Sequence, residues 1–286
     1  MKILEMAHGI IWGPWTVGIF LIVGLVLSVR CHFFQILGFK YWWKSTWGSL
    51  WEHGRGHDEK AVNNAGHLGI TQFQSVCTAL AATVGTGNIA GVAAAIVSGG
   101  PGAVFWMWIS ALVGMATAYG ETYLGCRYRF KDNRGKWVCG PFIYMEKGLG
   151  IPFMAVGYSF FCFLCALGMG SMVQANSAAE TLEFTWGIPS ALGSGILALL
   201  TGAVVLGGIK RIGKAAECLL PLASGIYILF SLLVLLLCAD RIPDVFLRIF
   251  QSAFGIRQIS GGIAGFGISK SLRYGISRGV FSNEAG

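Results

Sequence analysis

The sequence predicts an all-α integral membrane protein. Of its 286 residues, 55% are apolar and only 12% are charged, and the mean hydropathy is +0.65. A soluble domain carries about 25% charged residues, so long uncharged runs separated by basic segments indicate membrane-spanning helices. The chain lacks the alternating pattern of a membrane barrel. Its 42 glycines suit close helix packing and interrupted helices.

Seven apolar runs predict the membrane spans. The first is about 20 residues long, enough to cross a bilayer, and it lacks the small-residue cleavage site of a signal peptide. The third follows the turn signal Gly99-Gly100-Pro101, and the fifth begins at Pro189, a favourable first-turn position. The seven ranges are 10–30, 69–98, 102–125, 151–182, 189–208, 216–239 and 258–278.

Basic residues alternate between the two sides of these spans. The segments after the first, third and fifth spans hold five, six and three of them, whereas Ser98–Gly102 and Thr181–Pro189 hold none. Basic loops stay cytoplasmic. We therefore expect these segments on the cytoplasmic side of the plasma membrane and the N-terminus on its outer side. The net charge of +8 is then a consequence of topology, and no nucleic-acid partner is expected.

Two connecting segments and one cysteine pair have alternative interpretations. Residues 33–51 mix four tryptophans with two lysines, which is typical of an interfacial amphipathic helix or of an ordinary connector. Cys162 and Cys165 form a CxxC inside an apolar run, where packing as small hydrophobes fits better than metal chemistry. Residues 52–67 are a polar loop, for which a solvated segment fits better than a metal cluster of its four metal-ligating side chains, His53, His57, Asp58 and His67.

The second span contains a polar, glycine-containing centre, Thr83-Val84-Gly85-Thr86-Gly87-Asn88. A dinucleotide fingerprint would need a preceding strand and a soluble βαβ unit. A potassium-channel filter, one residue from TVGYG, would need a re-entrant loop between two helices. A packing face of Gly87-x-x-x-Gly91 explains two glycines, but neither the asparagine nor the threonines.

A discontinuous helix that lines a site explains all of these residues. Loosened backbone at membrane depth is tolerated where it lines a cavity. Amides at the start of the second half-helix favour an anion such as a carboxylate, and carbonyls at the end of the first half suit a small cation. Transporters use this pattern in paired helices, so we expect a second interruption in the seventh span, at Gly261–Gly267.

Several blocks of the sequence together resemble one family of transporters. They are TALAATVGTGNIAGVAAA, GPGAVFWMWISALVGMATAYGETYLGCRYR, GMGSMVQANS and SRGVFSNEAG. All are similar to the alanine/glycine:cation symporters, the sodium–alanine carriers, and the resemblance covers almost the whole chain. It implies a leucine-transporter-type fold, in which one extra helix precedes two inverted five-helix repeats.

The resemblance implies a single transporter domain over residues 1–286. Residues 10–30 are the extra helix, 69–239 the first repeat, and 258–286 the opening broken helix of the second repeat. Family members continue through four further helices. We therefore expect this portion not to transport alone and to need a continuation, or a second chain, that supplies the missing helices.

The resemblance also implies a site at the break in the second span. The substrate carboxylate is expected at three backbone amides: Gly85, Thr86 and Gly87. Sodium, the coupling ion, is expected at two candidate sites. The backbone carbonyls of Ala81 and Val84 are candidates for one of them, and Thr83 with the side chain of Asn88 for the other. Backbone recognition of a carboxylate fits span centres that lack basic residues. No cofactor is implied.

Two further elements complete the implied site. Gln174 is expected to bind the amino group or to line the pocket, although a polar residue inside a span often makes only an interhelical hydrogen bond. Phe266, between Gly265 and Gly267, is expected to roof a pocket small enough for alanine or glycine, because steric closure discriminates strongly against longer side chains.

Five other polar residues lie near the ends of the spans. Intramembrane carboxylates are functional candidates by default, but Glu121 can equally cap a helix or pair with a nearby arginine. Glu180 and Glu183 are expected at the membrane interface, and Asn283 and Glu284 at a cytoplasmic gate.

The sequence therefore predicts sodium-coupled symport of alanine or glycine. A channel, the first alternative, would show flux that neither saturates nor depends on an amino acid. A membrane enzyme, the second, would need a nucleophile–base or metal cluster near a span centre, and the sequence offers no convincing one.

Overall fold

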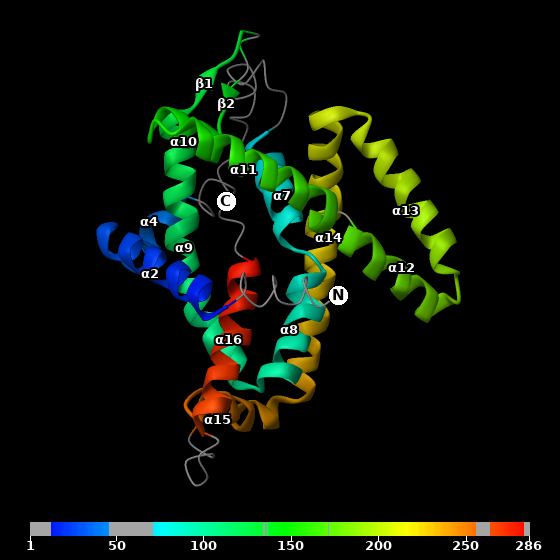
Figure 1. Ribbon diagram of the computed structural model, residues 1–286. Coiled ribbons are helices and arrows are strands. Elements are labelled where there is room, and N and C mark those ends of the chain that lie inside the picture. The colour runs from blue at the N-terminus through cyan, green and yellow to red at the C-terminus, as the bar shows by residue number, and fades with distance from the viewer. Residues whose placement is uncertain are drawn as a thin grey trace. The chain divides into compact units, whose positions relative to one another are not determined.

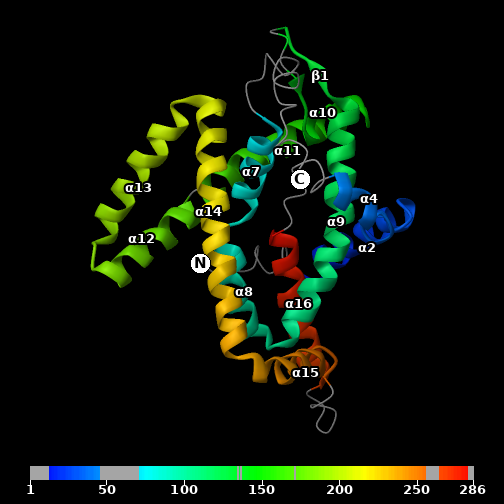
Figure 2. The ribbon, with the colours of Figure 1, turned by 180° about the vertical axis from the view of Figure 1, so that it is seen from behind.

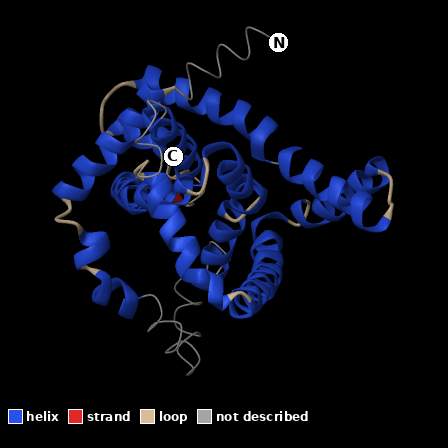
Figure 3. Cartoon of the chain, turned by 90° about the horizontal axis from the view of Figure 1, so that it is seen from below, coloured by secondary structure: helices blue, strands red, loops and turns tan. Residues whose placement is uncertain are grey.

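The computed structural model describes residues 13–45, 71–133, 135, 137–170, 172–255 and 264–282. Within these ranges the regular secondary structure is helical apart from one short antiparallel hairpin, and loops join the helices (Figures 1 and 3). The chain forms two compact units. The first unit is Met1–Glu52, Gly87–Thr122 and Leu229–Gly286, and the second unit is His53–Thr86 and Tyr123–Ile228.

The elements can be followed along the chain in Figures 1 and 2. They are α2 (Pro14–Arg30), α3 (Phe34–Leu37), α4 (Phe39–Trp43), α7 (Gln72–Thr83), α8 (Thr86–Gly99), α9 (Gly102–Tyr128), β1 (Phe130–Lys131), β2 (Trp137–Val138), α10 (Pro141–Lys147), α11 (Pro152–Cys165), η2 (Ala166–Gly170), α12 (Met172–Trp186), α13 (Ser190–Val205), α14 (Gly208–Leu237), η3 (Ala239–Arg241), α15 (Ile242–Ala253) and α16 (Ala264–Ser282).

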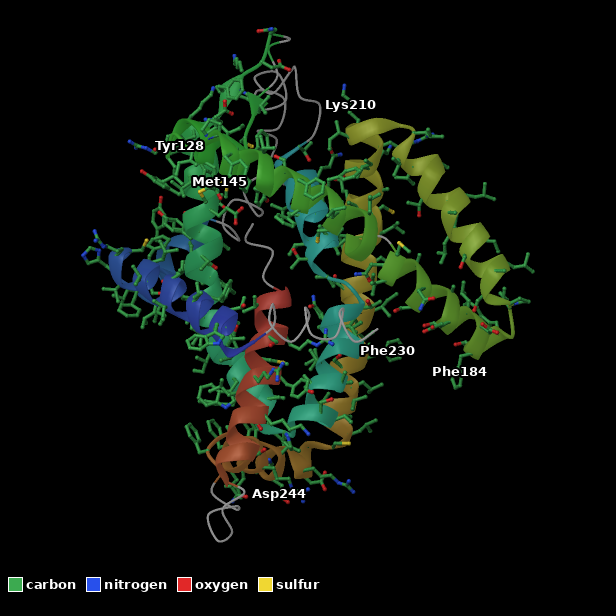
Figure 4. The ribbon with its side chains drawn as sticks, in the orientation of Figure 1. Tyr128, Met145, Phe184, Lys210, Phe230 and Asp244 are labelled. Atoms are coloured by element: carbon green, nitrogen blue, oxygen red, sulfur yellow. The ribbon has the colours of Figure 1, made fainter. Side chains whose placement is uncertain are left out.

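Membrane-length helices dominate the described part of the chain. Four helical stretches there are long and apolar enough to cross a bilayer: Phe73–Gly99, Gly102–Tyr128, Pro152–Trp186 and Gly208–Leu237. The helices α2 and α13 are apolar but shorter. Phe184 of α12 and Phe230 of α14 project from their helices (Figure 4) and are 94% and 61% exposed, as expected of lipid-facing side chains. The predicted class, an all-α membrane protein, is confirmed.

Some element bounds differ from the sequence prediction. The helix α14 begins at Gly208 rather than at residue 216, because a basic first segment continues the helix beyond its apolar part. Residues 33–51 were predicted as one helix, but their described part forms α3 and α4, with Gly38 between them. The hairpin of β1 and β2 pairs Phe130 with Val138, and strands of two residues are too short for a periodic signal.

The helix α15 lies in a stretch for which no helix was predicted. Its apolar residues recur with helical spacing and Pro243 occupies its first turn, so the sequence did contain a signal for it. In the first unit its aromatic side chains pack on α9. The ring centroids of Phe246 and Trp108 are 6.1 Å apart, and those of Phe250 and Phe105 are 5.5 Å apart.

Small residues in the first unit let α16 approach α8 and α9 closely. The Ser271 hydroxyl donates a hydrogen bond to the carbonyl of Gly99 at 2.5 Å, and both residues are buried. A Cβ would come closer than 3.0 Å to atoms of α9 at two further positions: Gly275, against Ala103, and Gly279, against Ser110. This four-residue spacing is the small-residue pattern of membrane helix pairs, and it fixes the register of α16.

The substitution Gly275→Ala tests this packing. The added methyl group would meet the carbonyl oxygen of Ala103, and overpacking of this kind costs about 1–3 kcal/mol. We expect a lower midpoint of thermal unfolding in detergent. The control is Gly225→Ala in α14, where a Cβ meets nothing within 4 Å; there we expect no loss. Equal midpoints for the two variants would contradict the close approach.

Candidate functional site

The predicted second span is interrupted where the glycine and threonine residues lie. The helix α7 ends at Thr83, and α8 begins at Thr86. Between them Val84 is extended, with φ −84° and ψ 96°, and Gly85 is also non-helical. The break leaves carbonyls at the end of α7 and amides at the start of α8 without partners inside either helix. The predicted interruption of this span is confirmed.

Local hydrogen bonds explain why the helix ends at this point. The hydroxyls of Thr78 and Thr83 donate to the carbonyls of Gln74 and Ala79 at 2.7 and 2.9 Å. Such bonds to the carbonyl four residues earlier weaken and bend helices. Gly85 then adds a residue that loses more conformational freedom in a helix than any other. The interruption is therefore encoded locally, within α7 and the two linking residues.

Gln174 satisfies part of the broken backbone in the second unit. The amide of Thr86 donates a hydrogen bond to Oε1 of Gln174 at 3.0 Å. A Cβ on Gly85 would come closer than 3.0 Å to the side-chain nitrogen of Gln174, so the glycine leaves the space that this amide occupies. The structure thus brings together three of the predicted site residues. The Gln174 side chain accepts its hydrogen bond from a backbone amide of the break, and not from a side chain of another helix.

A π-helical segment precedes Gln174 along the chain. The predicted fourth span is α11, then η2 at Ala166–Gly170, then α12, which begins at Met172. A π segment adds a residue to the turn and rotates everything that follows, and such segments often occur at functional sites. The sequence prediction missed it. The signal available was the pair of glycines in Gly168-Met169-Gly170, ahead of a polar residue inside an apolar helix.

The first turn of α7 is anchored in the second unit as well. Thr71 and Gln74 form a capping box, with both backbone-to-side-chain distances at 3.1 Å. The side-chain nitrogen of Gln74 also donates to a carboxylate oxygen of Glu217 in α14 at 2.8 Å. The half-helix that ends at the break is therefore held at its other end.

The predicted sodium ligands lie on both sides of the break along the chain. Ala81 and Thr83 are in the last turn of α7, Val84 is in the link, and Asn88 is in the first turn of α8. Thr83 and Asn88 are half-buried. The Thr83 hydroxyl donates a hydrogen bond to the carbonyl of Ala79.

The predicted pocket roof belongs to the start of α16, in the first unit. Gly265, Phe266 and Gly267 belong to the first turns of α16, which is continuous from Ala264 to Ser282; Gly261–Ile263 lie outside the described residues. Because Ser271 reaches Gly99, the start of α16 lies toward the end of α8 that is distant from the break. Their role as a pocket roof stays a prediction.

The end of α16 that runs back along α8 carries Arg278, which lies against Gly91. The expectation that span centres lack basic residues is therefore wrong for this helix. The cations of α16 are Lys270, Arg273 and Arg278.

The remaining candidate residues fall into three groups. Glu121 is half-buried in α9, Glu180 accepts a hydrogen bond from Asn176 at 2.9 Å, and Glu183 accepts one from Ser190. Cys162 and Cys165 are both exposed, and the described residues contain no group of three metal-ligating side chains. Six predicted residues lie outside the described residues: His53, His57, Asp58, His67, Asn283 and Glu284.

A double-mutant cycle tests the contact between Gly85 and Gln174. Gly85→Ala would push the Gln174 amide off the Thr86 nitrogen, and Gln174→Ala removes the same bond directly. Each change should lower the free energy of unfolding by about 1 kcal/mol, since the part-buried amide of Thr86 loses its hydrogen-bond partner. The double variant should cost about as much as one single variant in detergent unfolding. Costs that simply add would mean that the two residues do not interact.

Several transporters are similar in sequence to nearly the whole of this chain. The sodium/alanine symporter AgcS of Methanococcus maripaludis is 40% identical over 292 residues, covering 100% of this chain and 61% of the relative. The putative sodium/proton-dependent alanine carrier protein YrbD of Bacillus subtilis is 37% identical over 98% of this chain and 54% of its own length. The probable sodium/glutamine symporter GlnT of Bacillus subtilis is 35% identical over 99% of this chain and 56% of its own length.

The chain spans between 54% and 61% of the length of these relatives. The model of the sodium:alanine symporter family matches residues 1–286 of this chain. That family consists of multi-pass membrane transporters and not of enzymes. The apolar helices and the interrupted helix agree with this match, and we conclude that the chain belongs to the sodium:alanine symporter family.

Proposed function

We propose that this chain carries the transport site of a sodium-coupled symporter for a small neutral amino acid, alanine or glycine. The observation that carries the proposal is the interrupted helix, whose Thr86 amide is held by the side chain of Gln174. A break at membrane depth is tolerated where it lines a site. The names of AgcS and YrbD support alanine as substrate and sodium, or sodium and protons, as coupling ions.

The substrate carboxylate binds the amides of Gly85, Thr86 and Gly87 in this proposal. A helix start favours negative charge because its amides are unpaired and its dipole is positive there. The Gln174 oxygen already occupies the place of one carboxylate oxygen at Thr86. A bound amino acid replaces that oxygen, and the released side chain then accepts a hydrogen bond from the substrate ammonium group.

Sodium binds on the carbonyl side of the same break. The carbonyls of Ala81 and Val84, the Thr83 hydroxyl oxygen and the Asn88 side-chain oxygen supply the oxygen ligands that a hard cation requires. The ion and the carboxylate share one interrupted segment, so each favours the other's binding through opposite charge. This mutual stabilisation is the physical basis for coupling the two solutes.

The fold around this site is of the leucine-transporter type in our proposal. The helix α2 is the extra helix, α7 to α14 form the first repeat, and α16 opens the second, giving seven spans. The basic connecting segments face the cytoplasm, by the rule that positive loops stay inside. Further helices, from a continuation or from a second chain, complete the transport pathway by alternating access.

Uptake by the natural gene product that contains this chain tests the proposal. In proteoliposomes, radiolabelled alanine should accumulate saturably under an inward sodium gradient, and unlabelled glycine should compete. Asn88→Ala should lower uptake at least about 10-fold, the scale of effect seen when groups that support a bound metal are removed.

The matched control for this experiment is Asn176→Ala. This asparagine is exposed and donates only to Glu180 on its own helix, so uptake should stay near that of the unmodified protein. Flux that does not saturate and ignores sodium would contradict symport and favour a channel.

A further inference from the structure

The hairpin of β1 and β2 lies between two membrane-length stretches of the chain. It follows directly after the stretch Gly102–Tyr128, and α10 leads from it to the stretch Pro152–Trp186. The residues from Tyr123 to Ile228 belong to the second unit, where β1, β2 and α10 lie side by side (Figures 1 and 4). A short connection between two spans lies at the level of the lipid headgroups.

The register of the hairpin brings two basic side chains to one aromatic ring. Phe130 pairs with Val138, and Lys131 pairs with Trp137. Successive side chains of a strand point to opposite faces, so Arg129 shares the face of Lys131. The guanidinium carbon of Arg129 lies 4.8 Å from the ring centroid of Trp137, and Nζ of Lys131 lies 5.1 Å from the same centroid. Both cations are therefore held against one indole ring.

A third cation lies against the ring on the opposite face of the hairpin. Nζ of Lys147, the last residue of α10, is 3.4 Å from the ring centroid of Phe130. The end of α10 is held at the base of the hairpin, because a Cβ on Gly148 would lie 3.0 Å from Cζ of Tyr128. Packing of α10 thus places Lys147 beside the hairpin.

The three ring-held cations, Arg129, Lys131 and Lys147, are accessible and keep their charge. All three residues are exposed. An aromatic ring attracts a cation through its quadrupole but carries no net charge, so these contacts restrict the side chains without neutralising them. Over residues 127–147 the sequence has six basic residues and only two acidic ones, Asp132 and Glu146. This surface is therefore positive and partly ordered in advance of any ligand.

Exposed apolar side chains follow the ring-held cations along the chain. Leu149 and Phe153 are 62% and 84% exposed, as expected of side chains that contact lipid tails. A free phosphate would complement the cations alone, whereas a phospholipid complements the cations and the apolar side chains together. Clusters of basic residues next to a membrane span recognise anionic headgroups in this way.

We propose that the ring-held cations bind the headgroup of an anionic phospholipid. The planar fork of Arg129 matches two phosphate oxygens, and the ammonium groups of Lys131 and Lys147 add charge. The aromatic rings lower the conformational entropy that binding costs, because they position the cations beforehand. This lipid site is separate from the break between α7 and α8, and the inference does not depend on which solute is transported.

Lipid binding to the purified natural gene product tests the inference. Native mass spectrometry in detergent measures the dissociation constants of phosphatidylglycerol and phosphatidylcholine, and their ratio is the headgroup preference. The unmodified protein should prefer phosphatidylglycerol. The triple variant Arg129→Gln, Lys131→Gln, Lys147→Gln should lower that preference at least about 10-fold, because each basic residue near an anionic lipid surface strengthens binding roughly fivefold.

The matched control removes three exposed cations from the first two turns of α14: Lys210→Gln, Arg211→Gln and Lys214→Gln. It should leave the preference within about twofold of the unmodified protein, since attraction between charges falls off within a Debye length. Equal losses in the two triple variants would mean unspecific attraction and would overturn the inference. If the first triple variant does not fold, Lys131→Gln is compared with Lys214→Gln, and equal preferences would contradict the site. Displacement of phosphatidylglycerol by inorganic phosphate at constant ionic strength would show that the site binds free phosphate instead.

Discussion

The candidate site depends on the break between α7 and α8, and the Gln174 side chain gives one backbone amide of this break, that of Thr86, a hydrogen-bond partner. A helix in a membrane that stops and restarts exposes backbone groups to surroundings that offer no water, and each unsatisfied group costs several kcal/mol. Here Gln174 supplies one partner at 3.0 Å, and Gly85 supplies the space. The capping box of Thr71 and Gln74 holds the far end of α7. The interruption is thus stabilised by specific contacts.

The first unit shows how small residues decide where a charge lies. Ser271, Gly275 and Gly279 allow α16 to lie against α8 and α9, and this contact carries Arg278 onto Gly91. Packing between small residues therefore determines where this charge lies within the first unit.

Hydropathy and turn residues predicted the long helices well, because apolar length is what a bilayer selects. The break was also predictable, since two threonines, two glycines and an asparagine in one apolar run conflict with an ordinary spanning helix. The π segment before Gln174 was harder to predict, because a one-residue change of helical register leaves no periodic trace and the glycines Gly168 and Gly170 are the one signal for it. Glycine content alone does not separate a broken helix from a closely packed one, and α16 uses its later glycines for packing.

The most direct test is a cryo-electron microscopy structure of the natural gene product with sodium and alanine. The account predicts ligand density at the break between Thr83 and Asn88, with a carboxylate oxygen hydrogen-bonded to the Thr86 amide and the Gln174 oxygen displaced from it. Alanine bound elsewhere, with Gln174 still on Thr86, would contradict the claim that this break is the transport site.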